Sequence, residues 1–241
     1  MHTAIVTGAS GMIGGAIAKK IAAGGIAVVL CSNRNPERAE QLKDEILATG
    51  GEAVCLTGDL TRFDAAEKIA AETVRLYGRI DYLVAAAGIS QRGLFIDTDE
   101  EQWRQIMDAN LKSFASSARA VIPNMLKLGE GSILAVSSVW GKTGAAMEAL
   151  YSASKAGVSG LARALAKEYG GSGIRVNCIS PGAIDTPMNS FLSEEERNEL
   201  EETIPAGRFG TPEEVAEIAF AVLTNRYITG TDLTVDGGFT L

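Results

Sequence analysis

The chain has 241 residues, 46% of them apolar, and a formal net charge of -8. This length suits one large α/β domain with a sizeable core, and the apolar content excludes general disorder. The negative charge argues against a nucleic-acid partner, which would call for a basic surface.

The sequence shows no membrane, export or metal-binding pattern. No apolar run approaches the ~18–20 residues of a membrane span, and the chain enters a strand-like run at Thr3 without a charged leader segment. Cys31, Cys55 and Cys178 are odd in number and far apart, which is typical of free thiols in a reducing compartment. His2 is the only histidine, so neither a histidine-based triad nor a metal site is expected. We therefore expect a cytoplasmic protein.

The predicted elements alternate between strand and helix along the chain. Apolar runs typical of buried strands lie at Ala4–Val6, Ala27–Cys31, Ala53–Leu56, Tyr82–Ala86, Ser132–Val136, Arg175–Ile179 and Asp232–Val235. Helical periodicity predicts helices at Ile13–Ala23, Pro36–Thr49, Asp64–Tyr77, Glu100–Lys127, Tyr151–Tyr169 and Pro212–Thr224. Such alternation predicts a parallel sheet of about seven strands covered by helices on both faces. We expect a single doubly wound α/β domain spanning residues 1–241.

A glycine-rich turn, TGASGMIG, joins the first strand to the first helix over Thr7–Gly14. Glycines permit a tight turn and close approach of a ligand, and the helix N-terminus offers free N–H groups to pyrophosphate. A plain βα turn is the alternative, but the position at the start of the chain favours a Rossmann-type dinucleotide site. Its predicted contacts are Gly8, Ser10, Gly11, Ile13 and Gly14.

The end of the second predicted strand bears on the choice of dinucleotide. It reads Ser32, Asn33, Arg34, with no carboxylate before Glu37. An acidic residue here would bind a ribose 2′-hydroxyl, whereas a basic one accommodates a 2′-phosphate. Arg34 therefore favours NADP(H); the alternative is that it is a solvated loop charge.

The strongest chemical pattern is Tyr151 followed four positions later by Lys155 in a helical stretch. Residues at this spacing share a helix face, and a neighbouring ammonium lowers the pKa of a phenol. The pair therefore suits a general acid. Ser138 follows the apolar run Ser132–Val136, and its hydroxyl could donate to a carbonyl oxygen that gains negative charge. A surface tyrosine and lysine on an ordinary helix are the alternative.

These motifs, with Asp59-Leu60, Ala87-Gly88, Asn110 and Pro181-Gly182, resemble the short-chain dehydrogenase/reductase family over essentially the whole chain. The resemblance implies that Tyr151 is the acid/base, that Lys155 lowers its pKa and holds the nicotinamide ribose, and that Ser138 orients the substrate carbonyl. It also implies that Asn110 holds a water that relays protons to Lys155. Further cofactor contacts implied by the family are Asp59, Leu60, Ala87, Gly88, Pro181, Gly182, Ile184 and Thr186.

Two motifs depart from the usual family pattern. Met12 replaces the middle glycine of the first turn, and it would be strained if that position required positive φ. Ala85 and Ala86 replace two asparagines after the fourth strand, which removes side-chain hydrogen bonds that would brace the cofactor site.

Two groups within the family compete as relatives. The tail motifs Ile204–Glu214, Tyr227–Gly230 and Val235–Gly238 resemble 3-oxoacyl-(acyl-carrier-protein) reductases, which are NADPH-dependent homotetramers of fatty-acid synthesis. The segments Gly88–Gln91 and Ser138–Gly141, with Glu148, are similar to reductases of an aminoketone-modified lysine of translation elongation factor P. A non-catalytic NADP-binding protein is a third possibility. Trp140, Glu148 and Met188 are the expected substrate contacts.

The segment around residues 185–210 is predicted to form a mobile lid over the substrate. Within Asp185–Glu202 the glutamates are accompanied by a single arginine, Arg197, although a solvated helix face would explain the same pattern. A reductase that binds an acidic carrier protein should have a basic rim. We place that rim at the turns Lys127–Gly131 and Gly170–Gly173, which contain little positive charge.

Overall fold

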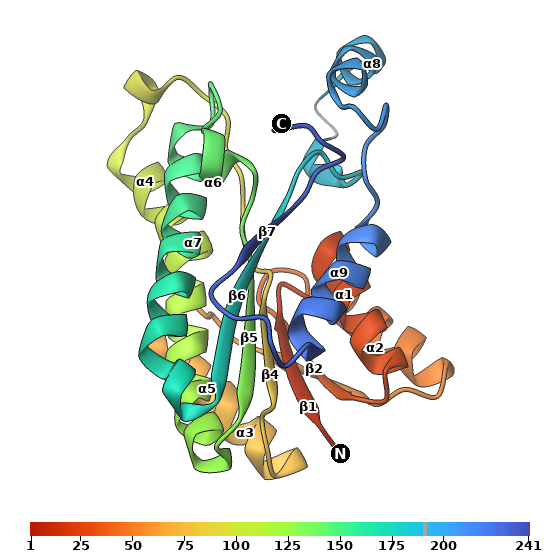
Figure 1. The fold of residues 1–241 in the computed structure, drawn as a ribbon, viewed down its shortest axis with the longest axis vertical. Helices are drawn as coiled ribbons and strands as arrows, with labels where there is room; N and C mark the ends of the chain where they lie inside the picture. Colours follow the sequence, from red (N-terminus) through yellow and green to blue (C-terminus); the bar gives the residue numbers. More distant parts are fainter. Residues whose placement is uncertain (190–191) are drawn as a thin grey trace.

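Seven parallel strands form the centre of the computed structural model, which describes residues 1–189 and 192–241 (Figure 1). The strands are β1 (Thr3–Thr7), β2 (Ala27–Ser32), β3 (Ala53–Thr57), β4 (Tyr82–Ala85), β5 (Gly131–Val136), β6 (Ile174–Pro181) and β7 (Asp232–Val235). Their order in the sheet is β3-β2-β1-β4-β5-β6-β7. Thr3 of β1 aligns with Ala27 of β2, and Ala4 aligns with Tyr82 of β4.

Helices cover both faces of this sheet (Figure 1). One face carries α3 (Phe63–Tyr77), α4 (Glu100–Met107), α5 (Ser113–Leu128) and α7 (Ala149–Tyr169). The other face carries α1 (Met12–Ala23), α2 (Pro36–Ala48) and α9 (Pro212–Thr224). Beyond the carboxyl ends of the strands lie two further helices, α6 (Trp140–Thr143) and α8 (Glu194–Thr203), and the short turns η1 (Phe95–Asp97) and η4 (Pro187–Asn189). A third short turn, η3 (Gly170–Ser172), precedes β6 at the amino ends of the strands.

The apolar strands form these layers because alternate residues face opposite helices. Ile5 and Leu83 belong to the core under α3, α5 and α7, whereas their neighbours Ala4 and Val84 belong to the core under α1 and α9. All four side chains are essentially inaccessible to solvent. The predicted doubly wound parallel fold is confirmed.

One predicted helix is interrupted. The stretch Glu100–Lys127 forms α4 and α5 joined by a π-helical turn, η2 (Asp108–Lys112). The side chain of Asn110 in this turn hydrogen-bonds both backbone groups of Ile89 and the hydroxyl of Ser154. A π-turn inserts one residue into the helical register, and such turns are frequent at functional sites.

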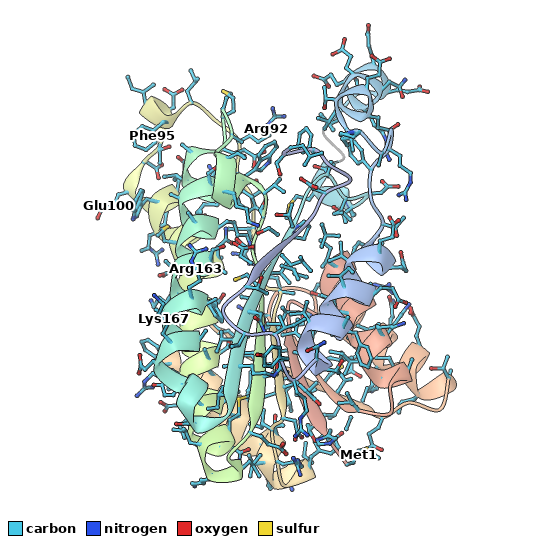
Figure 2. The ribbon with its side chains drawn as sticks, viewed as in Figure 1. Met1, Arg92, Phe95, Glu100, Arg163 and Lys167 are labelled. Atoms are coloured by element: carbon cyan, nitrogen blue, oxygen red, sulfur yellow. The ribbon has the colours of Figure 1, made fainter. Side chains whose placement is uncertain are left out.

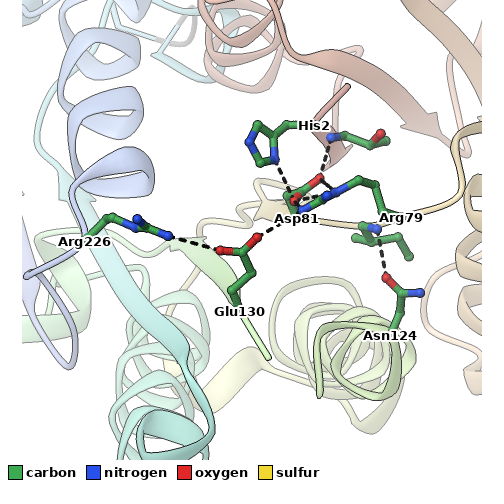
Figure 3. Close-up of polar contacts among 8 residues, drawn as sticks. His2, Arg79, Asp81, Asn124, Glu130 and Arg226 are labelled. Carbon is green, nitrogen blue, oxygen red and sulfur yellow. Dashed lines mark hydrogen bonds and ion pairs between the residues drawn. The ribbon is translucent and has the colours of Figure 1, made fainter. Parts of the chain in front are cut away.

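The turns that precede β5 and β6 lie at the amino edge of the sheet. Glu130 there forms ion pairs with Arg79 (3.1 Å) and Arg226 (3.2 Å), and Arg79 also pairs with buried Asp81 (Figure 3). Our placement of the docking rim at Lys127–Gly131 and Gly170–Gly173 is therefore wrong for this chain. In a parallel sheet these turns are separated from the strands' carboxyl ends by the full length of the strands.

Candidate active site

A cavity of about 980 Å³ opens at the carboxyl ends of the strands. It lies at the carboxyl ends of β1 and β4, which are neighbours in the sheet. From β1 the strands continue through β2 and β3 in one direction, and from β4 they continue through β5, β6 and β7 in the other. Open α/β sheets bind ligands at such a switch point. Of the predicted site residues, the cavity is lined by Gly8, Ser10, Gly11, Ile13, Gly14, Ser32, Asn33, Arg34, Asp59, Leu60, Ala87, Gly88, Ser138, Trp140, Glu148, Tyr151, Lys155, Pro181, Gly182, Ile184, Thr186 and Met188.

The glycine turn is packed too closely for side chains at two positions. Gly8 has φ +66°, and a Cβ there would lie 2.6 Å from the backbone nitrogen of Ala87. A Cβ at Gly14 would lie 2.4 Å from the carbonyl oxygen of Gly8. The turn therefore leaves open the space in front of the α1 N-terminus. A dinucleotide pyrophosphate fits this arrangement, since the first N–H groups of the helix face it.

Neither departure from the family pattern disturbs this turn. Met12 is the first residue of α1 and has ordinary helical backbone, and its side chain is half-exposed. Thr7 Oγ1 accepts a hydrogen bond from the Ala87 amide at 3.3 Å, so a side chain of β1 braces the end of β4. The strain expected for Met12 is therefore absent.

The end of the cavity beside β2 and β3, where the adenine is predicted to bind, contains short polar contacts. Asp59 accepts hydrogen bonds from the backbone and hydroxyl of Thr61, and the Ser32 hydroxyl donates to Ser10. Arg38, in the first turn of α2, lines the cavity beside Arg34 although we did not predict it from the sequence. Its position three residues after Asn35, the residue that caps α2, is the signal that could have identified it.

The side chains predicted to be catalytic lie just after β5 and near the start of α7. Tyr151 and Lys155 are buried, and the lysine Nζ lies 5.6 Å from the centroid of the tyrosine ring. Lys155 Nζ donates to the carbonyl oxygen of Val136 at 2.9 Å. Ser138 follows β5, and its Oγ accepts a hydrogen bond from the Trp140 amide at 3.2 Å. The strand end and the helix thus hold all three groups in one cavity.

Burial dominates the acid strengths of this pair. Burial raises the pKa of Tyr151 to about 12, although a hydrogen bond with Ser138 lowers it, and the charge of Glu148 raises it further. Burial also lowers the pKa of Lys155 to about 8. The Lys155 ammonium donates to the Val136 carbonyl, and the lowering of the phenol pKa by Lys155 stays a prediction.

Asn110 lies behind the cavity instead of lining it. Its Oδ1 accepts from the Ile89 amide at 2.7 Å, and its Nδ2 donates to the Ile89 carbonyl and to Ser154 Oγ, both at 2.9 Å. A Cβ on Gly88 would lie 3.1 Å from Asn110 Oδ1 and 3.2 Å from Lys155 Nζ. Asn110 therefore clamps the loop after β4 to η2 and α7.

Two loops form the wall at the end of the cavity where the substrate is predicted to bind. Ser90 Oγ donates to Glu148 Oε2 at 3.1 Å, and the amide of Gly93 donates to the carbonyl of Met147 at 2.8 Å. Met147 has φ +65° and is the one described residue other than glycine with positive φ. Backbone strain of this kind often accompanies functional sites. Arg92 also lines the cavity, and sequence reasoning did not identify it.

Comparisons with known proteins agree with this geometry. The family model described as enoyl-(acyl carrier protein) reductase matches residues 8–240. The chain belongs to the short-chain dehydrogenase/reductase family. Members use a nicotinamide cofactor, and the chain is thus an oxidoreductase acting on CH–OH or C=O groups.

Three relatives illustrate the match. The 3-oxoacyl-(acyl-carrier-protein) reductase FabG of Chlamydia muridarum is 39% identical over 237 residues, covering 98% of this chain and 96% of the relative. The uncharacterized oxidoreductase YmfI of Bacillus subtilis is 38% identical over 240 residues, covering 98% of both chains. A dehydrogenase/reductase from Sinorhizobium meliloti superimposes with a TM-score of 0.94 at 34% identity, covering 100% of this chain and 95% of that one.

Two observations on the residues that the structure describes concern metal-binding clusters and membrane-spanning helices. Among residues 1–189 and 192–241, no cluster of three or more His, Cys, Asp or Glu side chains could hold a metal ion. No helix within the described part of the chain is long and apolar enough to cross a membrane.

Proposed function

We propose that this protein is an NADP(H)-dependent ketone reductase whose substrate is a 3-oxoacyl thioester held on an acyl carrier protein. The observation that carries the proposal is the assembly of Ser138, Tyr151 and Lys155 around one cavity next to the glycine turn. The relatives named as 3-oxoacyl-(acyl-carrier-protein) reductases, at 35–39% identity over nearly the whole chain, support this substrate class.

Each side chain has a distinct role in the proposed reduction. Ser138 donates to the substrate carbonyl oxygen as negative charge develops there. Tyr151 gives its proton to the same oxygen, and Lys155 holds the nicotinamide ribose and supplies positive charge behind the phenol. When bound, the nicotinamide provides the hydride. Asn110 holds the loop after β4 against η2 and α7 from behind the cavity.

The cofactor preference rests on the charges at the adenine end. Arg34 and Arg38 both line this end of the cavity, next to the Ser32 hydroxyl and Asn33. A 2′-phosphate would receive charge-assisted hydrogen bonds from the guanidinium groups. No carboxylate stands at the end of β2 to bind a free 2′-hydroxyl instead. NADPH is therefore the proposed reductant.

The lid and the assembly extend the proposal. We propose that residues 185–210 cover the substrate; residues 190–191 of this segment lie outside the described part of the structure. Arg197 connects α8 to Asp185 (3.0 Å) and stacks over Phe209. A homotetramer is also proposed, because α5 and α7 share an outward apolar groove of about 310 Å³ that includes Ile122 and Leu165.

A second candidate is reduction of the aminoketone-modified lysine of elongation factor P. The observation that favours it is the carboxylate of Glu148, which lies at the substrate end of the cavity beside Ser90. A carboxylate there suits a substrate with a free amine. The acidic helix α8 near the mouth also disfavours an acidic carrier protein, since like charges reduce affinity and slow encounter.

The experiment compares acetoacetyl-carrier protein with the ketone-modified factor in an assay of NADPH oxidation. Efficient turnover of the carrier thioester, with no effect of Glu148→Gln, supports the first candidate. Reduction of the modified factor alone, with a KM that Glu148→Gln raises, supports the second. NADPH binding without turnover of either substrate, or of free acetoacetyl thioester, would indicate a non-catalytic cofactor-binding protein.

A further inference from the structure

One of the two arginines proposed to bind the 2′-phosphate is engaged by its own helix. The Arg38 amide donates to Asn35 Oδ1, which places Arg38 in the first turn of α2, and the residue lines the cavity. Its Nη1 donates to Gln41 Oε1 at 3.3 Å and to Glu45 Oε1 at 3.1 Å. Both acceptors lie further along α2, so Nη1 of Arg38 is directed toward the C-terminal end of this helix.

The carboxylate of Glu45 is shared with a second cation. The helices α1 and α2, red and orange at the right of Figure 2, lie side by side. Nζ of Lys19 on α1 lies 2.5 Å from Glu45 Oε2, while Oε1 accepts from Arg38. The hydrogen bond from Lys19 is the main cause that lowers the pKa of Glu45, and Arg38 lowers it further. Glu45 is thus ionised at neutral pH, and its charge is divided between Lys19 and Arg38.

This division affects how tightly Arg38 can bind a 2′-phosphate. A phosphate monoester carries about −1.5 to −2 charges at pH 7, and guanidinium groups bind it through charge-assisted hydrogen bonds. Glu45 already engages one nitrogen of the guanidinium, and its negative charge offsets part of the positive charge. Glu45 and the phosphate therefore compete for Arg38. NADH has a hydroxyl in place of this phosphate, so its binding does not depend on that competition.

Solvent exposure sets the size of the effect. The side chains of Lys19, Arg38 and Glu45 are 51%, 41% and 42% exposed. An ion pair with this exposure changes an equilibrium constant by a few-fold, up to ~5-fold. Glu45 therefore adjusts the affinity for a 2′-phosphate and does not abolish it.

We propose that Glu45 is a positioning residue that weakens the binding of the 2′-phosphate by Arg38, and that Lys19 opposes this effect by pairing with the same carboxylate. The inference rests on the proposed NADP(H)-dependent function, and it adds the residues that set how strongly NADPH is preferred over NADH. Loss of the Glu45 charge releases Arg38 to the phosphate. Loss of Lys19 leaves the whole charge of Glu45 to Arg38.

Cofactor binding measures the effect without any ketone substrate. The dissociation constants of NADPH and NADH are obtained by fluorescence titration of the full chain, and the ratio Kd(NADH)/Kd(NADPH) gives the preference. We expect Glu45→Gln to raise this ratio by ~2–5-fold, and Lys19→Met to lower it by a factor in the same range. Both changes should come from the Kd of NADPH.

Matched controls separate these contacts from general effects of charge. Asp44→Asn removes a carboxylate charge from the neighbouring position of α2, where the side chain is 75% exposed and pairs with Lys43. Lys20→Met removes a lysine from the next position of α1, which pairs with Glu217. Neither control should change the ratio, because neither side chain contacts Arg38 or Glu45.

Double variants show whether the effects pass through the named contacts. Lys19→Met should have no effect on the ratio in the Glu45→Gln background, and Glu45→Gln should have none in the Arg38→Ala background. A ratio that Glu45→Gln leaves unchanged or lowers, or a rise that persists without Arg38, overturns the inference. Equal affinity of the wild type for the two cofactors contradicts the proposed NADPH dependence instead, and the response of the ratio to Glu45→Gln still decides the role of Glu45.

Discussion

Replacing Gly14 with alanine tests whether the glycine turn forms the cofactor cradle. An added Cβ would lie 2.4 Å from the carbonyl oxygen of Gly8 and 3.0 Å from its carbonyl carbon. Both atoms belong to the backbone, so no side-chain rotation relieves the contact. Even a close C–H···O contact spans ~3.3–3.6 Å, so α1 must move away from the turn by roughly 1 Å.

The size of the effect follows from two opposing contributions. Alanine within a helix is favoured over glycine by ~0.5–1 kcal/mol, whereas overpacking of this kind costs ~1–3 kcal/mol. The free energy of unfolding should therefore fall by roughly 0.5–2 kcal/mol, which corresponds to a decrease in Tm of about 1–8 °C for a chain of this size. NADPH affinity should fall further, by at least ~10-fold, because the N–H groups that face the phosphates are displaced.

Thermal unfolding and NADPH fluorescence titration measure the two effects. The control is Gly160→Ala in α7, where an added Cβ meets nothing within 4 Å. This variant should gain ~0.5–1 kcal/mol and keep its NADPH affinity. Wild-type Tm and affinity in Gly14→Ala would refute the close packing. A lowered Tm with unchanged affinity would refute the location of the cradle.

Four further predictions concern catalysis, cofactor choice, assembly and stability. Tyr151→Phe should keep NADPH affinity but lower kcat by roughly 10²–10⁴-fold, and near wild-type kcat on any accepted ketone excludes Tyr151 as the acid. The wild type should prefer NADPH, and Arg34→Ala should reduce that preference because it removes a charge-assisted contact worth ~1.5–3 kcal/mol. Equal kcat/KM for NADPH and NADH in the wild type contradicts the role of Arg34 in binding the 2′-phosphate. Light scattering should show a tetramer for the wild type. Leu165→Lys should dissociate it, because the substitution places a charge in the apolar groove between α5 and α7. A wild-type monomer at micromolar concentration refutes the proposed tetramer. Burial alone would raise the pKa of Asp81, but hydrogen bonds from Arg79, His2 and the Thr3 amide lower it overall. The stability it contributes is present above the unfolded-state pKa of ~3.9 and is lost as pH falls through the lower folded-state value. Asp81→Asn should therefore lower the Tm at pH 7 and weaken its acid dependence, and an unchanged Tm refutes the contribution.

The sequence by itself determined the layers of the fold and the main chemical motif. Each buried strand is a short apolar run, and each covering helix has its own periodicity, so both can be recognised without knowing their neighbours. The same holds for Tyr151 and Lys155, because a spacing of four on a helix places them on one face. The glycine turn is equally local, since its position between a strand and a helix is visible in the chain.

Contacts between distant segments were decided only by the tertiary structure. Ser90 contacts Glu148, 58 positions later in the chain. Ser90 lies in the loop after β4, and Glu148 lies between α6 and α7, after β5. The two loops meet because β4 and β5 are neighbours in the sheet. Asn110 points toward Ile89 because a π-turn shifts the helical register, which periodicity does not reveal. Whether Met12 is strained depended on where α1 begins. Whether the predicted docking rim lies near the cavity depended on which edge of the sheet its two turns occupy. Local patterns specify elements, whereas the order of strands in the sheet determines which loops surround the same cavity.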